Sequence, residues 1–334
     1  MAFPLSVLDL SPIDAGSNSA QALQNTIELA RAADRLGYTR YWLAEHHNTS
    51  SIASSTPEIM IASVARETTR IRVGSGGIML PNHTPLKVAE TFRVLEALYP
   101  ERIDLGIGRA PGTDQVTALA LRRSREALGA DDFPEQLAEL LAFSTGEFPE
   151  EHPFRSVTAT PGDVELPPIW LLGSSGFSAQ LAGALGLGFA FAHHINPISA
   201  VEATRAYREN FTPSAQLKQP HTIITASVIC AETEERAEEL ASTSDVAMLR
   251  LYSGRSGPLA SPEEALSYPY TAVERAHVRS LRSRRLIGTA ASVKEQLTRL
   301  VERTEADEAM ITTLFYGHEN RLRTYELLAE TFGL

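Results

Sequence analysis

Three adjacent polar residues, Glu45, His46 and His47, follow the apolar stretch 41–44. Histidine has an ordinary pKa close to neutral pH, so one of the pair could donate or accept a proton in a reaction. The pair could also bind a metal ion or only satisfy loop carbonyls. Neighbouring residues of a strand point to opposite faces, so the two imidazoles cannot easily share one metal ion. No His-x-His pair or suitably spaced carboxylate supplies further ligands, and we therefore expect no metal site.

Glycines interrupt a second apolar stretch, VGSGGIMLP, at Gly76 and Gly77. Glycine weakens a strand, and it is expected where the backbone must come close to a ligand or where the strand bulges. A flat ring system lying against the end of the strand would use such a surface. The pattern is compatible with this role and with a simple bulge.

Two further loops have the residue types that bind an anion. Arg109 follows the stretch LGIG, and a cation flanked by small residues suits a phosphate or a carboxylate. The segment Ser174, Ser175, Gly176 and Phe177 leads from an apolar stretch into a helix, where hydroxyls and open N–H groups can hold an anion. Together they predict a site for one phosphate rather than for a pyrophosphate.

Two other candidate positions are less specific. His193 and His194 end another apolar stretch, and they could take part in a reaction or serve the structure alone. Cys230 ends yet another apolar stretch, and we interpret this cysteine as a small buried hydrophobic residue.

The elements that must position these residues alternate between short apolar stretches and longer helical patterns. Gly37 and Gly186 are expected to end helices, while Thr56 and Thr84, each before a proline, are expected to begin them. The predicted strands are 5–10, 39–44, 71–79, 102–108, 168–172, 188–194, 223–230 and 309–315. Eight strands, each followed by a helix, predict an α/β fold of the (β/α)8 TIM-barrel type. A doubly wound open sheet is the alternative, but no GxGxxG loop follows the first strand.

A long insertion is expected in the C-terminal half of a single domain that spans residues 1–334. It covers about 251–288, is rich in Gly, Ser and Pro at first, and has a helical pattern around 271–285. A long insertion in a barrel is a lid or a wall of the substrate site, or a solvated excursion. Tyr252, Arg255 and Tyr270 are its candidates for substrate contact.

Composition limits the class of protein. The 334 residues include 30 Lys and Arg against 41 Asp and Glu, a net charge of −11, which argues against a nucleic-acid partner. A single cysteine excludes an intrachain disulfide and fits a reducing compartment. We expect no signal peptide and no membrane span, and hence a cytoplasmic protein.

Five stretches together resemble the bacterial luciferase-like flavin monooxygenases, in the branch that carries an EHH signature. They are RYWLAEHHN, IRVGSGGIMLPNHTPLKVAE, ERIDLGIGRAPGTD, IWLLGSSGFSAQLAGALG and LIGTAASVKEQL. The resemblance extends from about residue 5 to 332, with the stretches in the family's order. It implies a TIM barrel with an insertion near the C-terminal part, and a flavin at the C-terminal barrel mouth.

The resemblance also implies roles for individual residues. His46 matches the family's catalytic acid or base beside the flavin. Gly76 and Gly77 match the pair that forms a non-prolyl cis peptide behind the isoalloxazine ring. Arg109 matches a phosphate-binding arginine. The phosphate loop of the family corresponds to Ser174, Ser175, Gly176 and Phe177.

Three positions depart from luciferase itself. Gly108 stands where luciferase has a reactive cysteine, Gly173 where it has an acidic residue, and Phe177 where it has a hydroxyl residue. A second phosphate-binding arginine has no clear counterpart. Light emission is therefore not expected.

The implied activity is that of a two-component monooxygenase and homodimer. FMN, reduced by a separate flavin reductase, would react with O2 to give a C4a-peroxyflavin that oxidises a small organic substrate. Hydroxylation and attack on a carbonyl both stay open. The alternatives are an F420-dependent oxidoreductase, a non-enzymatic flavin-binding protein and a metal hydrolase on the same barrel.

Overall fold

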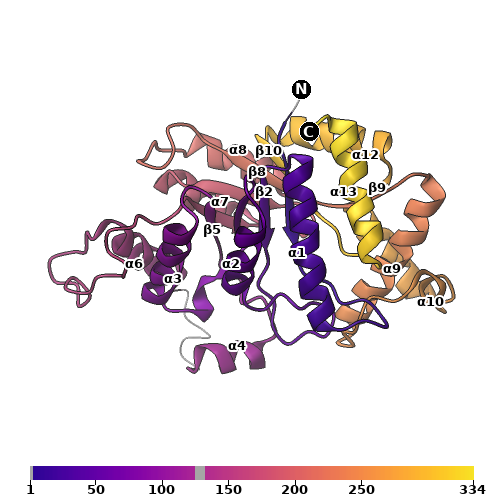
Figure 1. The fold of residues 1–334 in the computed structure, drawn as a ribbon, viewed down its shortest axis with the longest axis horizontal. Helices are drawn as coiled ribbons and strands as arrows, with labels where there is room; N and C mark the ends of the chain where they lie inside the picture. The colour runs from indigo at the N-terminus through magenta and orange to yellow at the C-terminus, as the bar shows by residue number, and fades with distance from the viewer. Residues whose placement is uncertain (1–2, 125–131) are drawn as a thin grey trace.

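Eight parallel strands close into a barrel in the computed structural model, which describes residues 3–124 and 132–334 (Figure 1). The strands are β1 (Leu5–Asp9), β2 (Arg40–Leu43), β3 (Arg72–Ser75), β5 (Ile103–Gly108), β6 (Ile169–Gly173), β7 (Gly188–Ala192), β8 (Thr222–Ala231) and β10 (Glu308–Thr312). Each of these strands overlaps one of the eight strands predicted from the sequence. The short β4 (Ile78–Met79) pairs with β5. Because β10 pairs with both β1 and β8, the sheet closes on itself, and the open-sheet alternative is excluded.

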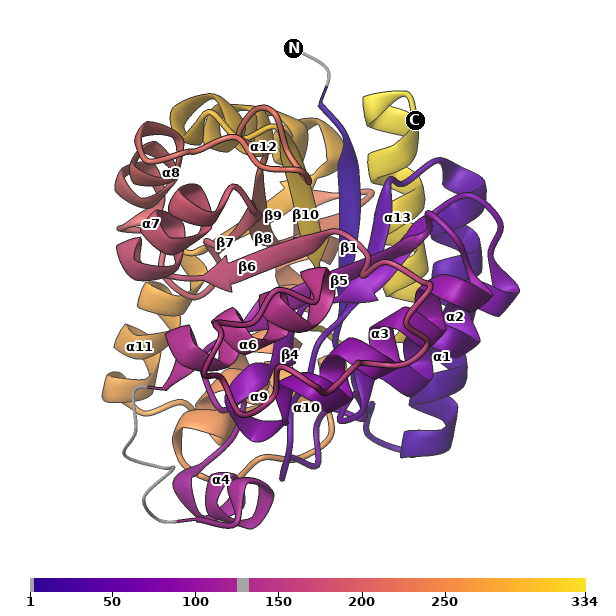
Figure 2. The same ribbon diagram turned by 90° about the vertical axis from the view of Figure 1, so that its left-hand side faces the viewer.

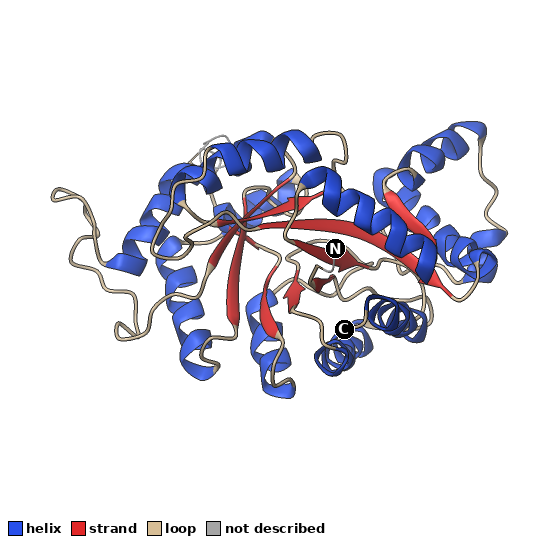
Figure 3. Ribbon diagram, turned by 90° about the horizontal axis from the view of Figure 1, so that it is seen from above, coloured by secondary structure: helices blue, strands red, loops and turns tan. Residues whose placement is uncertain are grey.

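Helices surround the strands (Figure 3). They are α1 (Ser19–Leu36), α2 (Pro57–Glu67), η1 (Leu80–Asn82), α3 (Pro85–Leu98), α4 (Gln115–Arg122), α6 (Phe133–Thr145), α7 (Gly176–Leu185), α8 (Ala200–Glu209), α9 (Glu234–Tyr252), α10 (Pro262–Leu266), α11 (Ala272–Arg282), α12 (Ala290–Thr304) and α13 (His318–Phe332). In the described part of the chain, no helix combines the length and the apolar character that a membrane crossing requires.

The helix boundaries confirm the predicted ends more fully than the predicted beginnings. Gly37 after α1 and Gly186 after α7 adopt left-handed backbone, with φ of 93° and 63°, and the N–H of each bonds back into the last turn. Thr56 and Thr84 precede α2 and α3, but neither side chain accepts a hydrogen bond from its helix. The following prolines, with their fixed φ and missing N–H, begin these helices without a side-chain cap.

The interior of the barrel is packed with side chains. The inner cluster consists of Leu8, Trp42, Ala44, Trp170, Ala190, Ile223 and Met310. The rings of Trp42 and Trp170 meet edge to face, with centroids 5.7 Å apart. A Cβ at Gly188 would lie 2.4 Å from the Trp170 ring, so glycine is required there.

Ion pairs fill the amino-terminal end of the barrel. Arg40 at the start of β2 contacts Asp104 at 2.8 Å and Glu308 at 3.0 Å, and Arg72 contacts Asp104 at 2.7 Å. The two carboxylates are fully or almost fully buried. Both termini lie at this end, while α4 and α10 lie at the other (Figures 1 and 2). A ligand therefore has to approach from the carboxyl ends of the strands.

The insertion differs from the prediction in two elements, the short helix α10 and a strand. Its helical pattern around 271–285 is realised as α11, but residues 285–289 form a strand, β9 (Arg285–Thr289). β9 pairs with the second half of β8, from Ser227 to Ala231, which extends beyond the barrel. The first half of β8 is used by β7 and β10. The edge that β8 offers beyond the barrel explains why a strand forms there.

The other end of the insertion is hydrogen-bonded to the loops that follow β1 and β2. Ala15 donates to the carbonyl of Leu259, and Leu259 donates to the carbonyl of Ile13, each at 2.8 Å. The hydroxyl of Ser256 lies 2.8 Å from that of Thr49. The insertion thus contacts the rim at the carboxyl end of the barrel.

Candidate active site

The end of β2 presents its polar residues to two different sides. Trp42 and Ala44 belong to the inner cluster, and His46 lies close enough to His194 for its charge to lower the pKa of that imidazole. Glu45 and His47 point the other way, and Glu45 accepts a hydrogen bond from His47 at 2.9 Å. The expected separation of the two adjacent histidines is therefore present.

Glu45 is fully buried and contacts three groups. Besides His47, it lies 3.0 Å from His83 and accepts a hydrogen bond of 2.8 Å from the backbone N–H of Met79. Burial alone would raise the pKa of Glu45, but His83 and then His47 lower it overall. Burial alone would lower the pKa of His83, but Glu45 raises it overall. The carboxylate therefore fixes β4 and two imidazoles in place.

Sequence reasoning did not select His83. It follows β4 and η1, 38 positions after Glu45 along the chain, and no local spacing links the two. Its signal is a lone histidine between two prolines, in LPNHTP.

His46 has a buried ring nitrogen without a hydrogen-bond partner in the described part of the chain. Its backbone N–H donates to the carbonyl of Ser54 at 2.9 Å, which holds the rim loop, but its buried Nδ1 contacts no polar partner among the described residues. Burial is the main cause that lowers the pKa of His46. The imidazole is thus held neutral near pH 7, with one ring nitrogen available to a ligand.

The two members of the second histidine pair, His193 and His194, also have different surroundings. The Nδ1 and the backbone N of His194 both lie 3.2 Å from the carbonyl of Thr225. A carbonyl only accepts, so Nδ1 carries the proton and Nε2 is left as an acceptor. Burial, with smaller contributions from the charges of His193 and His46, lowers the pKa of His194 to about 4, although the bond to Thr225 opposes the shift. His46 and His194 therefore lie near each other at the mouth, whereas His193 lines a different cavity.

Glycines crowd the inner side of β3 and β5. The peptide bond between Gly76 and Gly77 is cis, as predicted. A Cβ at Gly76 would lie 2.6 Å from Leu8 Cδ1, and one at Gly77 would lie 2.8 Å from the carbonyl oxygen of Gly106. Close packing of the chain against itself accounts for both glycines. A ligand against this surface stays a prediction.

The predicted anion loops lie together. The guanidinium of Arg109 covers the ring of Phe177, 4.6 Å from its centroid, so β5 and α7 bring the two loops into contact. Ser175 is the N-cap residue of α7 and accepts no hydrogen bond from it, and a Cβ at Gly176 would meet nothing within 4 Å. The first turn of α7 therefore offers backbone N–H groups to a ligand.

One residue that orders this loop was not predicted. The side chain of Asn196 donates to the carbonyl of Ser174 at 2.9 Å and to the hydroxyl of Ser199 at 3.2 Å. The loop after β7 thus supports the loop after β6.

The remaining candidates, Cys230 and three side chains of the insertion, contact residues of their own regions, and substrate contact by the insertion stays a prediction. Cys230 is buried and unpaired, and burial raises its pKa to about 12, as expected of a hydrophobic residue. Tyr252 packs on His277 with ring centroids 4.8 Å apart, and Tyr270 packs on Tyr268 at the same distance. Arg255 bonds to Ser253, so all three candidates of the insertion contact other residues of the same region. Within residues 3–124 and 132–334, no group of three or more His, Cys, Asp or Glu side chains is arranged to hold a metal ion.

Known proteins resemble this chain over its whole length. A family model described as luciferase-like monooxygenase matches residues 3–308. A luciferase-like monooxygenase of Escherichia coli K12 is 43% identical over 322 residues, which cover 96% of this chain and 95% of that protein.

Two solved structures show the same fold. The crystal structure of apo-MsnO8 matches with a TM-score of 0.91 and 39% identity, and the match covers 100% of this chain and 98% of that one. The oxygenating constituent of 3,6-diketocamphane monooxygenase from Pseudomonas putida, solved in complex with FMN, matches with a TM-score of 0.73. Its identity is 20%, over 99% of this chain and 98% of that chain.

Proposed function

The chain belongs to the luciferase-like monooxygenase family and is therefore an oxidoreductase that incorporates oxygen, and on that premise we propose that it uses reduced FMN. A separate flavin reductase would supply the reduced cofactor, and a small organic molecule would be the substrate. The observation that carries the proposal is the contact of Arg109 with Phe177 beside the uncapped first turn of α7. The FMN complex of the diketocamphane monooxygenase, which shares the fold, is consistent with this choice of cofactor.

The residues at the barrel mouth fit FMN. The guanidinium of Arg109 and the N–H groups of Gly176 and Phe177 suit one phosphate, because charge-assisted bonds and a helix N-terminus both favour an anion. The ring system would lie over the backbone of Gly76 and Gly77, which presents no side chain. The cofactor supplies the electrons that activate O2.

The chain's own contribution is to bind, orient and protonate. His46 would hold a proton at the ring nitrogen that faces the mouth, and its buried Nδ1 suits a hydrogen bond to the cofactor or the substrate. Glu45 would keep this turn and β4 in register through the N–H of Met79. The segment from Ser256 to Leu259 would narrow the mouth and exclude water, because it contacts the rim loops.

A homodimer is the proposed assembly. Ile59 on α2 is 63% exposed, and Val94 and Leu98 on α3 are 46% and 61% exposed. Three large apolar side chains on neighbouring helices make a surface that a second copy of the chain would cover.

Binding and oxygen reactivity test the proposal separately. Anaerobic titration measures the Kd of reduced FMN, of oxidised FMN and of F420. We expect reduced FMN to bind most tightly. Arg109→Met should weaken it by about tenfold to a hundredfold, since a charge-assisted hydrogen bond contributes about 1.5–3 kcal/mol. Arg155→Met, in an exposed loop, is the matched control and should bind normally. Preference for F420 would contradict the choice of cofactor.

Rapid mixing of the reduced complex with O2 then follows the return of oxidised FMN absorbance. We expect the protein to delay that return relative to free FMN, and His46→Gln to shorten the delay at unchanged Kd. Return at the rate of free FMN in the unmodified protein would refute a monooxygenase and would leave a flavin-binding protein.

A further inference from the structure

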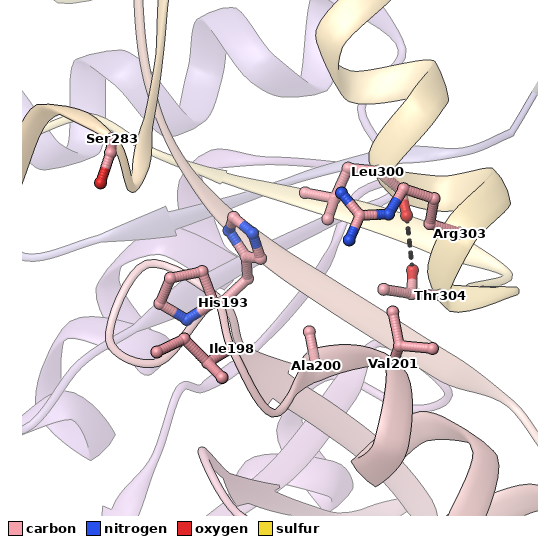
Figure 4. Close-up of a pocket in the computed structure, with 9 residues that line it drawn as sticks. His193, Ile198, Ala200, Val201, Ser283, Leu300, Arg303 and Thr304 are labelled. Atoms are coloured by element: carbon pink, nitrogen blue, oxygen red, sulfur yellow. Dashed lines mark hydrogen bonds between the residues drawn. The ribbon is translucent and has the colours of Figure 1, made fainter.

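A cavity of about 240 Å³ lies outside the barrel, between the start of α8, the end of α12 and the turn from α11 to β9 (Figure 4). It shares no lining residue with the mouth, where His46, His194 and Arg109 lie. No step of the proposed oxidation uses it.

Two of the four polar side chains that line this cavity already use their hydrogen-bond donor. The hydroxyl of Ser283 donates to the carbonyl of Ser280 at 2.9 Å, and that of Thr304 donates to the carbonyl of Leu300 at 2.8 Å. The side chains of the other two, His193 and Arg303, form no hydrogen bond or ion pair within the described ranges; His193 is half-buried and Arg303 is exposed.

These two side chains converge. Figure 4 shows the guanidinium of Arg303 extended toward the imidazole of His193. Burial and then the charge of Arg303 lower the pKa of His193, and the Nδ1 of His193 is buried without a partner. A cation and a second potential donor thus face each other with no acceptor between them. Arg303 is exposed, so water can reach its donors, whereas the Nδ1 of His193 is buried; an anion between the two side chains would accept from both.

The other lining side chains are apolar, namely Pro197, Ile198, Ala200, Val201 and Leu300, of which Ile198 is 90% exposed. The volume equals that of about eight water molecules at roughly 30 Å³ each, so a bound molecule has only a few carbon atoms. A planar carboxylate matches the two-pronged donor of an arginine, and a short chain matches the apolar wall.

We propose that this cavity binds a short-chain carboxylic acid, with its carboxylate between Arg303 and His193 and its hydrocarbon chain against Ile198, Val201 and Leu300. The site goes beyond the proposed oxidation and does not depend on FMN.

Calorimetric titration of the full chain, free of flavin, with butyrate tests this directly. We expect saturable one-to-one binding of butyrate, and none of 1-butanol, which keeps the chain but lacks the charge. Arg303→Gln should weaken butyrate by about tenfold or more, and His193→Gln by less, because only the former loses a charged donor. Arg299→Gln, on the same helix in an exposed ion pair with Glu295, is the matched control and should bind as the unmodified protein does.

The ring signals of His193 in NMR spectra give a second readout that does not depend on the affinity. Butyrate should raise the pKa of His193, because the carboxylate favours the imidazolium. No saturable binding of butyrate, or equal binding of 1-butanol, would overturn the proposal. So would inorganic phosphate that binds in place of butyrate, or affinity lost in Arg109→Met and kept in Arg303→Gln.

Discussion

Glu45→Gln and His46→Gln, changes at adjacent positions, should separate stability from activity. Glu45 is fully buried and contacts two imidazoles and one backbone N–H, whereas the buried Nδ1 of His46 bonds to nothing that the structure describes. The first change removes a charge that two imidazoles and one backbone N–H contact. The second replaces an imidazole with an amide of similar reach and breaks no side-chain hydrogen bond.

The magnitude for Glu45→Gln follows from the contacts. The two bonds to imidazoles are charge-assisted, and each contributes about 1.5–3 kcal/mol. The amide oxygen can still accept from the N–H of Met79, and the amide nitrogen can donate to a neutral imidazole, so the loss is partial. We expect the free energy of unfolding to fall by about 3 kcal/mol, at the lower end of the cost of breaking a buried pair. His46→Gln should change it by less than about 1 kcal/mol.

Urea unfolding followed by circular dichroism measures both values, and the oxygen-mixing experiment measures the function of each variant. Glu45→Gln should shift the unfolding midpoint, whereas His46→Gln should keep the midpoint and lose the delay in flavin oxidation. The reasoning is refuted if both variants unfold at the midpoint of the unmodified protein, or if His46→Gln is the less stable of the two.

Three other predictions use different features. The ion pair of His83 with the buried glutamate should stabilise most between pH 4.5 and 6.5, the ordinary values of the two groups. The raised pKa of His83 makes its contribution disappear as pH rises through the folded value, and the lowered pKa of the glutamate makes its contribution disappear as pH falls through the folded value. The difference in unfolding free energy between the unmodified protein and His83→Gln should therefore peak in that window and shrink at pH 9; a flat difference contradicts the pairing. Gly106→Ala should cost at least about 3 kcal/mol in a thermal unfolding assay, because its Cβ would lie 2.1 Å from a backbone oxygen of β3, whereas Gly176→Ala, with open space, should be near neutral. Leu98→Glu should convert a dimer to a monomer in analytical ultracentrifugation, and an unchanged mass would remove α3 from the interface.

The sequence predicted the barrel because its strands and helices have local signals. Apolar stretches mark all eight barrel strands, and glycines mark the ends of α1 and α7. β9 was not predicted, because its stretch, RLIGT, follows a basic helix. It forms a strand only because β8 extends beyond the barrel and leaves an edge for it to pair with.

The sequence indicated which residues lie at the ends of strands and helices in the candidate site, but not which side chains contact each other there. His46, Arg109 and Phe177 lie at strand ends or a helix start, where local pattern places them. The contact of Glu45 with His83 joins two loops through a buried carboxylate, and only the folded chain creates it. The inner glycines also have a reason that the sequence does not display, because the atoms that would meet their Cβ belong to distant strands or to side chains inside the barrel.

The pairing of β1 with β10 has a consequence for how the chain is made. Leu5 lies opposite Ala309, so the first strand to leave the ribosome lacks one neighbour until nearly the whole chain has been synthesised. Until then β1 and β8 each have an unpaired edge of the kind that attracts other strands. The rim loop around Thr49 likewise lacks its hydrogen bond to Ser256 until about two hundred more residues have been synthesised. Shortening the chain before β10 should therefore leave an open, association-prone sheet rather than a smaller enzyme.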